Sequence, residues 1–115
     1  MSSGVKRGEV YYTTLPDRGR GIQSGIRPVV VISNDIGNHF SNVVIVAPVT
    51  SKRKTNLPTH TTITLDKKST ILCEQLTTVH KSKLYNKIHT LTETELTALD
   101  NALRASIGID QKEAI

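Results

Sequence analysis

The sequence is poor in the residue types that build redox, metal and aromatic sites. Cys73 is the only cysteine among 115 residues, so no disulfide can form within the chain and a cysteine-based metal site is not expected. Tryptophan is absent and aromatic residues make up 3% of the chain, which argues against a sheet that stacks nucleobases on aromatic rings. No apolar run approaches the roughly 20 residues that a membrane helix needs. The first residues do not form a signal peptide, so we expect a cytoplasmic protein without membrane contact.

Familiar cofactor motifs are also missing. The four histidines show no metal-ligand spacing, and Gly19-Arg20-Gly21 is too short for a dinucleotide loop and precedes no helix. We therefore expect neither a metal nor a cofactor. His39 and His60 lie in predicted turns and are interpreted as structural residues.

Charge is unevenly placed along the chain. The formal net charge is +5, and 13 of the 15 basic residues but only 5 of the 10 acidic residues precede Leu91. A basic body followed by an acidic segment favours a polyanionic partner, with nucleic acid more plausible than a membrane. Simple solubility is the alternative explanation of this charge.

Length and hydrophobic pattern predict one α+β domain that is rich in strands. A chain of 115 residues suffices for one core, so we expect a single domain over residues 1–115, with flexible ends at 1–4 and 110–115. A loop at 16–26 holds three glycines and two arginines, and a second basic loop lies at 50–58. Residues 34–39 are interpreted as a bend, 66–68 as a turn and 81–84 as one helical turn. Strands are predicted at 9–15, 29–33, 43–49, 61–65, 69–80 (as one or two strands) and 87–90.

The C-terminal segment predicts one helix of about 15 residues. Thr92 and Glu95 have the spacing of a capping box, and Leu91 and Leu96 that of a hydrophobic staple. Gly108 is placed to end the helix. The expected architecture is a small barrel of six or seven strands with this helix packed on it.

The stretch from Gly25 to Ser33 organises the rest of the chain. Pro28 should open a buried strand, because its nitrogen has no proton for a ladder hydrogen bond. Arg27 would then lie just outside the sheet, at the mouth of the strand, with its guanidinium free to face a ligand. Taken alone, Arg27 would be interpreted as a solvated residue beside a turn, and it is the rest of the chain that favours a functional role.

Several motifs in a fixed order give a resemblance that covers nearly the whole chain, from about residue 5 to residue 109. The chain resembles the MazF/PemK family of toxins from type II toxin–antitoxin systems. The stretches that carry the resemblance are Val5-Lys-Arg-Gly-Glu-Val-Tyr11, Gln23-Ser-Gly-Ile-Arg-Pro-Val-Val-Val-Ile32, Asn34-Asp-Ile-Gly-Asn38, Val44-Ile-Val-Ala-Pro-Val-Thr50, Leu57-Pro-Thr-His60 and Ile71-Leu-Cys-Glu-Gln75.

The resemblance implies an SH3-like barrel that forms a homodimer and binds RNA near the dimer interface. It also implies metal-independent cleavage of single-stranded messenger RNA at a short sequence, leaving 2′,3′-cyclic phosphate and 5′-hydroxyl ends. A cognate antitoxin would cover the same groove. The catalytic pair implied is Arg27 and Thr50, with Glu74 as the remaining counterpart of the carboxylates offered as the base.

Elementary chemistry supports the roles of Arg27 and Thr50. Attack by a 2′-hydroxyl gathers negative charge on the phosphoryl oxygens, and a guanidinium offers fixed donors to them. Neither group is a convincing base, because arginine stays charged and a threonine hydroxyl is not basic. Glu74 could instead be a structural carboxylate that pairs with a basic residue.

Further polar residues are candidates for contact with RNA. One set could read base edges, and another lies on the two basic loops and could contact phosphates; each could also be an ordinary turn or solvated residue. The first set is Gln23, Ser24, Ser33, Asn34 and Gln75, and the second is Arg18, Arg20, Lys52, Arg53 and Lys54.

The chain departs from the family pattern at two positions. Ile22 stands where many members have Glu, and Leu72 stands where PemK-like members have Arg. These losses make a protein that binds RNA or antitoxin without turnover one alternative. A gyrase poison like the related CcdB toxins is another, although the basic loops, Arg27 and Thr50 would then have no role.

Overall fold

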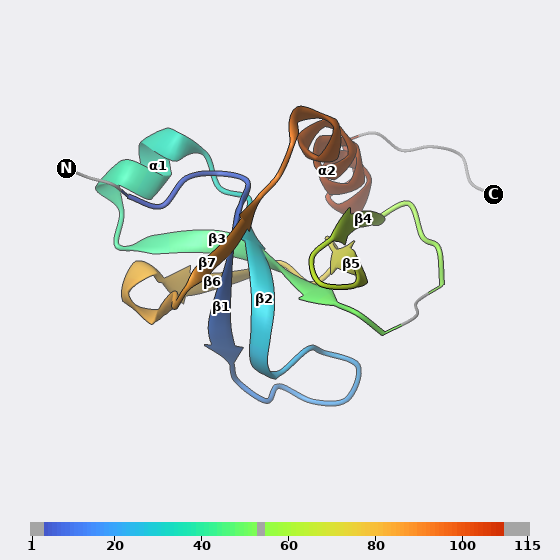
Figure 1. Ribbon diagram of the computed structural model, residues 1–115, viewed down its shortest axis with the longest axis horizontal. Coiled ribbons are helices and arrows are strands. Elements are labelled where there is room, and N and C mark those ends of the chain that lie inside the picture. The colour runs from blue at the N-terminus through green and yellow to red at the C-terminus, as the bar shows by residue number, and fades with distance from the viewer. Residues whose placement is uncertain (1–3, 53–54, 110–115) are drawn as a thin grey trace.

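The computed structural model describes residues 4–52 and 55–109. Over these residues the chain forms a curled antiparallel sheet with two α-helices at its edges (Figure 1). In chain order the elements are β1 (Glu9–Leu15), β2 (Gly25–Val31), α1 (Asp35–Phe40), β3 (Val43–Thr50), β4 (His60–Thr64), β5 (Lys68–Leu72), β6 (Thr77–His80), the 3₁₀ turn η1 (Lys81–Lys83), β7 (Lys87–Thr90) and α2 (Glu93–Ser106).

Strand β3 is the centre of the sheet. Along one edge it pairs with β2, and along the other it pairs first with β6 and then with β5. The sheet order is β4-β5-β3-β2-β1-β7, with β6 beside β3 off this path. Because β5 and β6 share one edge of β3, the turn between them, Cys73–Gln75, lies beside the middle of that strand. This turn positions the candidate site.

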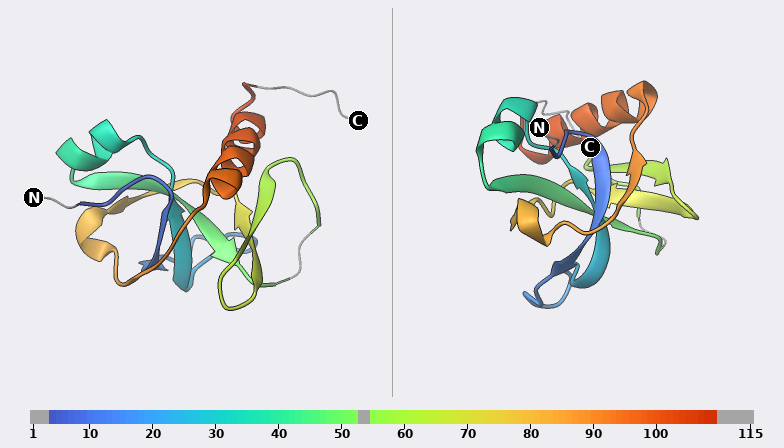
Figure 2. Two further views of the ribbon diagram at one scale, coloured as in Figure 1. Left: turned by 45° about the horizontal axis from the view of Figure 1, so that its top comes forward. Right: turned by 60° about the vertical axis from the view of Figure 1, so that its left-hand side comes forward.

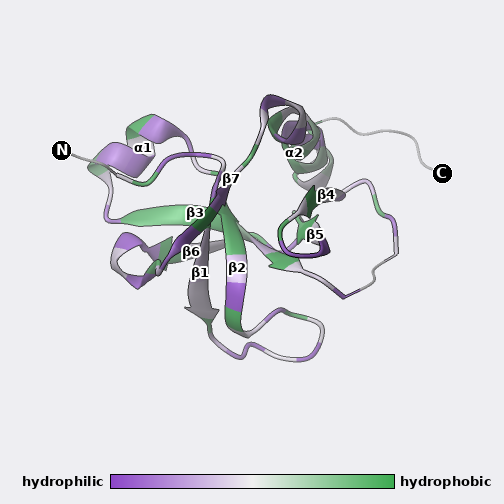
Figure 3. Ribbon diagram, in the orientation of Figure 1, coloured by the Kyte–Doolittle hydropathy of each residue, from purple (hydrophilic) through white to green (hydrophobic). Residues whose placement is uncertain are grey.

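Apolar residues on both faces of β2 and β3 are buried, which explains why these strands are apolar along most of their length. Val30 and Ala47 belong to the core cluster that includes Leu99 of α2. Val29 and Val31, whose side chains alternate with that of Val30, belong to a second cluster on the other face. Figure 3 shows β3 hydrophobic over most of its length.

Helix α2 is fixed at both ends as its sequence predicts. Thr92 Oγ1 accepts a hydrogen bond from the Glu95 N–H, and Glu95 Oε1 accepts one from the Thr92 N–H. Gly108, with φ of 79°, follows the helix in a conformation that glycine adopts without strain. Leu99 and Ala102 are buried on the face that packs towards β4.

The predicted fold class is confirmed: the chain is a β-rich α+β domain with a curled sheet and a C-terminal helix. Two local predictions are wrong. Residues 35–40, expected as a bend, form α1, because the Asn34 side chain accepts from the Gly37 N–H and caps a helical turn. Strand β2 begins at Gly25 and not at Val29.

The early start of β2 has a physical reason. Pro28 pairs with Tyr12 of β1, but the ladder between β2 and β3 begins only at Val29. Pro28 therefore occupies a strand position that has a partner on one side only, where a missing N–H is tolerated.

Removal of the helix cap should weaken the fold measurably. Thr92→Ala should lower the free energy of unfolding by about 1 kcal/mol, because the Glu95 N–H loses its acceptor. Urea denaturation followed by circular dichroism measures this difference. Thr94→Ala is the matched control, since Thr94 is exposed in the same helical turn; an equal loss in both variants would contradict the capping role.

Candidate functional site

Arg27 lies inside strand β2, and not outside the sheet as predicted. It pairs with Thr13 of β1, and its side chain is half-buried. Its Nε donates to the backbone oxygen of Ser24 at 2.9 Å, which fixes the plane of the guanidinium. Arg27 therefore combines a fixed orientation with the permanent charge of a guanidinium.

Thr50 is the last residue of β3, one residue beyond the predicted end of that strand. It pairs with Thr70 of β5 and is only 2% exposed. Its hydroxyl oxygen accepts from the Lys52 N–H at 3.1 Å and so fixes the start of the β3–β4 loop. The hydroxyl proton is not used in that bond and remains available for donation.

Arg27 and Thr50 lie at the same end of the β2–β3 pair. The last pair of that ladder is Val29 with Pro48, and Arg27 and Thr50 each lie two residues beyond it on their own strands. A pocket of about 230 Å³ opens there, lined by Arg27 and by both neighbours of Thr50. Its lining residues are Tyr12, Ile26, Arg27, Pro28, Val49, Ser51, Leu65, Asp66, Lys67 and Ser69.

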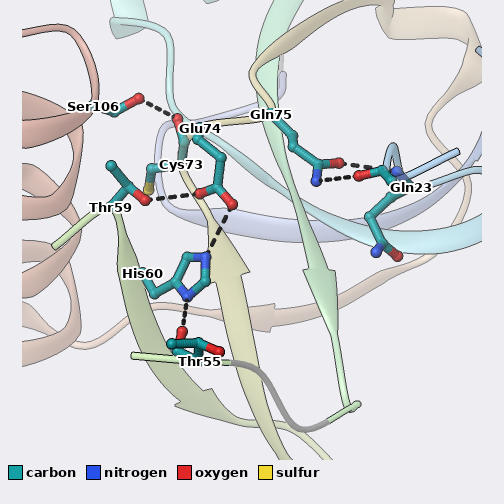
Figure 4. A network of polar contacts seen from close by, with 9 residues as sticks. Gln23, Thr55, Thr59, His60, Cys73, Glu74, Gln75 and Ser106 are labelled. Carbon is teal, nitrogen blue, oxygen red and sulfur yellow. Dashed lines mark hydrogen bonds and ion pairs between the residues drawn. The ribbon is translucent and has the colours of Figure 1, made fainter. Parts of the chain in front are cut away.

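Gln75 holds the β1–β2 loop against the turn that follows β5. Its Oε1 accepts from the Gln23 N–H at 2.9 Å, and its Nε2 donates to the Gly21 backbone oxygen at 3.0 Å (Figure 4). Arg18 of the same loop donates to Thr77 Oγ1 at 2.9 Å. The predicted RNA-contacting residues Gln23 and Gln75 thus bind one another, and Arg18 binds Thr77, two residues after Gln75.

The side-chain oxygen of Gln23 remains without a partner. Gln23 Oε1 is buried and, among the residues that the structure describes, it is the one such side-chain atom without a hydrogen bond. A buried acceptor of this kind destabilises the closed loop unless a donor reaches it.

Glu74 is the centre of a second network on the same turn (Figure 4). Its Oε1 accepts from Thr59 Oγ1 at 2.9 Å, and its Oε2 lies 2.9 Å from His60 Nε2. The other ring nitrogen of His60, Nδ1, lies 2.8 Å from the Thr55 backbone oxygen. The network therefore ties the β3–β4 loop and the start of β4 to the turn.

The environment keeps Glu74 ionised and Cys73 protonated. Burial by itself raises the pKa of Glu74, but hydrogen bonds from His60, from its own backbone and from Thr59 outweigh burial and hold the pKa below its usual value. Burial, with a smaller effect of the Glu74 charge, raises the pKa of the Cys73 thiol to about 12. Cys73 is therefore a packing residue and not a nucleophile.

Glu74 is not placed beside Arg27 and Thr50. Thr70 of β5 pairs with Thr50, and β5 runs antiparallel to β3 from there. Glu74 follows the last residue of β5, Leu72, and so lies further from Thr50 than Thr70 does. Glu74 lines a separate pocket, which does not include Arg27. Its role as the catalytic base stays a prediction, and this geometry favours a binding role.

The remaining predicted residues are scattered. Ser33 and Asn34 lie at the opposite end of β2 from Arg27, where the Ser33 hydroxyl bonds Asn38 and Asn34 caps α1. Both views of Figure 2 show α1 and the β1–β2 loop at different ends of the sheet. Arg20 and Lys52 are exposed on the two basic loops, and Ser24 is half-buried. Arg53 and Lys54 lie outside the described residues.

Sequence reasoning missed the part that His60 plays in this site. His60 was interpreted as a structural turn residue, but its side chain, 6% exposed, contacts Glu74 directly. The signal was present in the Leu57-Pro-Thr-His60 motif, yet nothing in its spacing from Glu74 shows that β4 and β5 set the two residues side by side.

Two further observations concern cations and membranes. Within residues 4–52 and 55–109, no three His, Cys, Asp or Glu side chains gather where they could hold a metal ion. No helix in the described part of the chain is long and apolar enough to cross a membrane.

The fold is shared with solved toxin structures. An endoribonuclease in complex with its cognate antitoxin from a Mycobacterial species is 22% identical, with a TM-score of 0.77 over 94% of this chain and 99% of that one. MazF from Deinococcus radiodurans is 19% identical, with a TM-score of 0.78 over 93% of this chain and 99% of that one. The class of the fold is therefore that of the MazF-type barrel.

Sequence comparison establishes the family. Residues 6–107 match the family described as PemK-like, MazF-like toxin of type II toxin-antitoxin system. The chain is also 42% identical to the endoribonuclease MazF of Staphylococcus epidermidis over 112 residues, which cover 92% of this chain and 93% of that protein. This chain belongs to the PemK-like, MazF-like toxin family of type II toxin–antitoxin systems.

Loss of the Gln75 amide should open the β1–β2 loop. Gln75→Leu removes both bonds to the loop with little change in volume, so the Gln23 amide should exchange its hydrogen about thirtyfold faster, the scale of two ordinary hydrogen bonds. Hydrogen exchange followed by NMR measures this rate. Gln23→Leu leaves both bonds in place, so the backbone amide of residue 23 should still exchange slowly. Equal exchange rates in the parent and in Gln75→Leu would show that the two Gln75 bonds do not hold the loop in solution.

Proposed function

We propose that this toxin is an endoribonuclease that cleaves single-stranded messenger RNA at a short sequence without a metal ion. The observation that carries the proposal is the location of Arg27 and Thr50, each two residues beyond the last β2–β3 pair, beside an open pocket that Arg27 and both neighbours of Thr50 line. Family membership and the relative from Staphylococcus epidermidis, named an endoribonuclease, support the same reaction.

The proposed reaction is an internal transfer at phosphorus. The 2′-oxygen attacks the adjacent phosphorus as its proton leaves, the bond from phosphorus to the 5′-oxygen breaks, and that oxygen takes up a proton. The products are a 2′,3′-cyclic phosphate and a 5′-hydroxyl. Arg27 stabilises the charge on the phosphoryl oxygens, and Thr50 donates one further hydrogen bond.

The two groups differ in access to a substrate. Arg27 is half-buried beside the open pocket, whereas Thr50 is almost fully covered. Donation from Thr50 to a phosphate therefore requires the residues that cover it to shift when RNA binds. Lys52, Arg18 and Arg20 are exposed and supply positive charge along the path of the RNA backbone.

The proposed partners follow from charge and from exposed apolar surface. An acidic antitoxin segment, like RNA, complements a chain of net charge +5. A second copy of the chain is the other partner, supported by Ile36 and Phe40 of α1, which are 75% and 80% exposed. An activity on messenger RNA supports a location in the cytoplasm.

Substitution of either catalytic residue should abolish most cleavage. Arg27→Ala and Thr50→Val should each reduce the cleavage rate at least about a hundredfold, the scale for loss of one transition-state donor. Valine keeps the branched shape of the buried Thr50, so the fold should survive. Mapping of cleaved RNA ends gives the rate, and thermal denaturation checks the fold.

Conservative variants supply the controls. Arg27→Lys keeps the charge without the planar fork and should rescue activity only in part, whereas Thr50→Ser keeps the hydroxyl and should rescue more. The Arg27→Ala and Thr50→Val double variant should be little worse than the poorer single variant, because the two groups act on one phosphate. Near-parental cleavage by folded Arg27→Ala would refute the mechanism.

Chelation tests the metal-independence of the reaction. Cleavage should continue at the same rate in excess EDTA, because the proposed mechanism places charge stabilisation on Arg27 and Thr50 alone. Loss of activity that one added divalent metal restores would contradict this mechanism.

A further inference from the structure

The side chain of Thr13 is completely buried, although its neighbours Tyr12 and Thr14 on strand β1 are exposed. Thr13 Oγ1 donates a hydrogen bond to the backbone oxygen of Lys83, which lies 2.8 Å away. A buried hydroxyl without a partner destabilises a fold, and this bond offsets that cost. Valine would fill the same space but could not make the bond.

Strand register places Thr13 directly beside Arg27. The two residues are partners in the antiparallel ladder of β1 and β2. Side chains of such partners point to the same face of the sheet, with Cβ atoms about 4.5–5.5 Å apart. Val29, two residues after Arg27, belongs to the second core cluster, so this face is covered. Thr13 therefore flanks the Arg27 side chain at its root.

Two restraints act on the Arg27 side chain. Its Nε donates to the Ser24 backbone oxygen at 2.9 Å, near the outer end of the side chain, and Thr13 lies beside its root. Arginine has a long side chain with many rotamers, so one bond at the outer end leaves the rest free to move. A group that stabilises a transition state is most effective when its orientation is fixed before the substrate binds.

The bond from Thr13 also fixes the segment that follows β6. Lys83 is the last residue of η1, and the next residue, Leu84, packs against the second core cluster. The connection between β6 and β7 runs beside β1 (Figure 1). Thr13 thus links η1, through its hydroxyl, to the place on the sheet where Arg27 is rooted. Loss of the hydroxyl would release η1 and loosen the packing beside Arg27.

We propose that Thr13 is a positioning residue of the cleavage reaction, which holds the Arg27 side chain in its reactive orientation through the bond to Lys83. Thr13 does not contact the RNA, because it is completely covered and lies at the root of the Arg27 side chain. It acts through Arg27 alone. The inference rests on the proposed function, since it explains how the proposed charge-stabilising group is held.

The first test separates turnover from binding. Thr13→Val keeps the shape of the side chain and removes its donor. The kcat for cleavage of a single-stranded RNA should fall about tenfold, because a misplaced guanidinium stabilises the transition state less. The KM should stay within about twofold of the parental value, since the exposed basic residues that would bind the RNA are unchanged.

Two further variants control this comparison. Thr13→Ser keeps the hydroxyl and should retain most of the parental kcat. Thr14→Val is the same substitution at the next residue, which is exposed and whose Oγ1 lies 3.0 Å from Tyr85 Oη; its kcat should equal that of the parent. If Thr13→Val does not fold, Thr13→Ala supplies the same comparison with Thr13→Ser.

A double-mutant cycle distinguishes positioning from stability. In the Arg27→Ala background, Thr13→Val should cause no further loss of kcat, because no side chain is left to position. All rates are measured at a temperature at which thermal denaturation shows every variant folded. An equal fractional loss of kcat in both backgrounds would make Thr13 purely structural and overturn the inference, as would a parental kcat in Thr13→Val.

The orientation of Arg27 has a readout that needs no cleavage. NMR follows exchange of the Arg27 Nε hydrogen, whose signal is assigned by its disappearance in Arg27→Lys. Thr13→Val should speed this exchange about fivefold, the scale of one hydrogen bond, because the bond to Ser24 is weakened. If the parent does not cleave, the proposed function fails, and faster exchange in Thr13→Val still supports the positioning role. Unchanged exchange rejects it whether or not the parent cleaves.

Discussion

The turn Cys73–Gln75 is the constraint on which the arrangement of the site depends. Strands β5 and β6 must lie end to end along one edge of β3, so the chain between them has to turn within a few residues. Each residue of this turn then binds a different part of the molecule. The Cys73 backbone oxygen accepts from Ser106 of α2, Glu74 binds the β3–β4 side through His60 and Thr59, and Gln75 binds the β1–β2 loop.

This arrangement explains how two long loops with little to bury can be placed accurately. Loop residues bury few apolar atoms, so their position depends on polar bonds to a rigid element. Gln75 supplies two such bonds to the β1–β2 loop, and His60 bonds the backbone of Thr55 on the β3–β4 side. Arg27 and Thr50 are positioned differently, by the pairing of strands whose apolar side chains form the core. The residues proposed to stabilise charge are thus positioned by the sheet, and the residues proposed to contact RNA are positioned on the loops.

The sequence predicted the elements well where a local pattern decides the structure. Strand β7 and the start of α2 lie where the pattern set them, because β-branched residues and a Thr92–Glu95 capping box act over a few residues. The start of β2 could not be predicted in this way. Pro28 lacks an N–H and so signals an opening position, but the pairing of Tyr12 with Pro28 allows β2 to begin at Gly25, four residues before the predicted start at Val29. A partner strand that is distant in sequence outweighed the local signal.

The sequence by itself determined the fold class, the family motifs, the basic loops and the residue types of the site, because these depend on composition, period and order along the chain. Only the tertiary structure decided which of those residues meet. It buried Thr50 under the β3–β5 pairing, moved Ser33 and Asn34 to the far end of β2, and separated Glu74 from Arg27. It also set His60 against Glu74. The reason is that strand register and sheet curvature bring together positions that are far apart in sequence, and no local pattern records those distances.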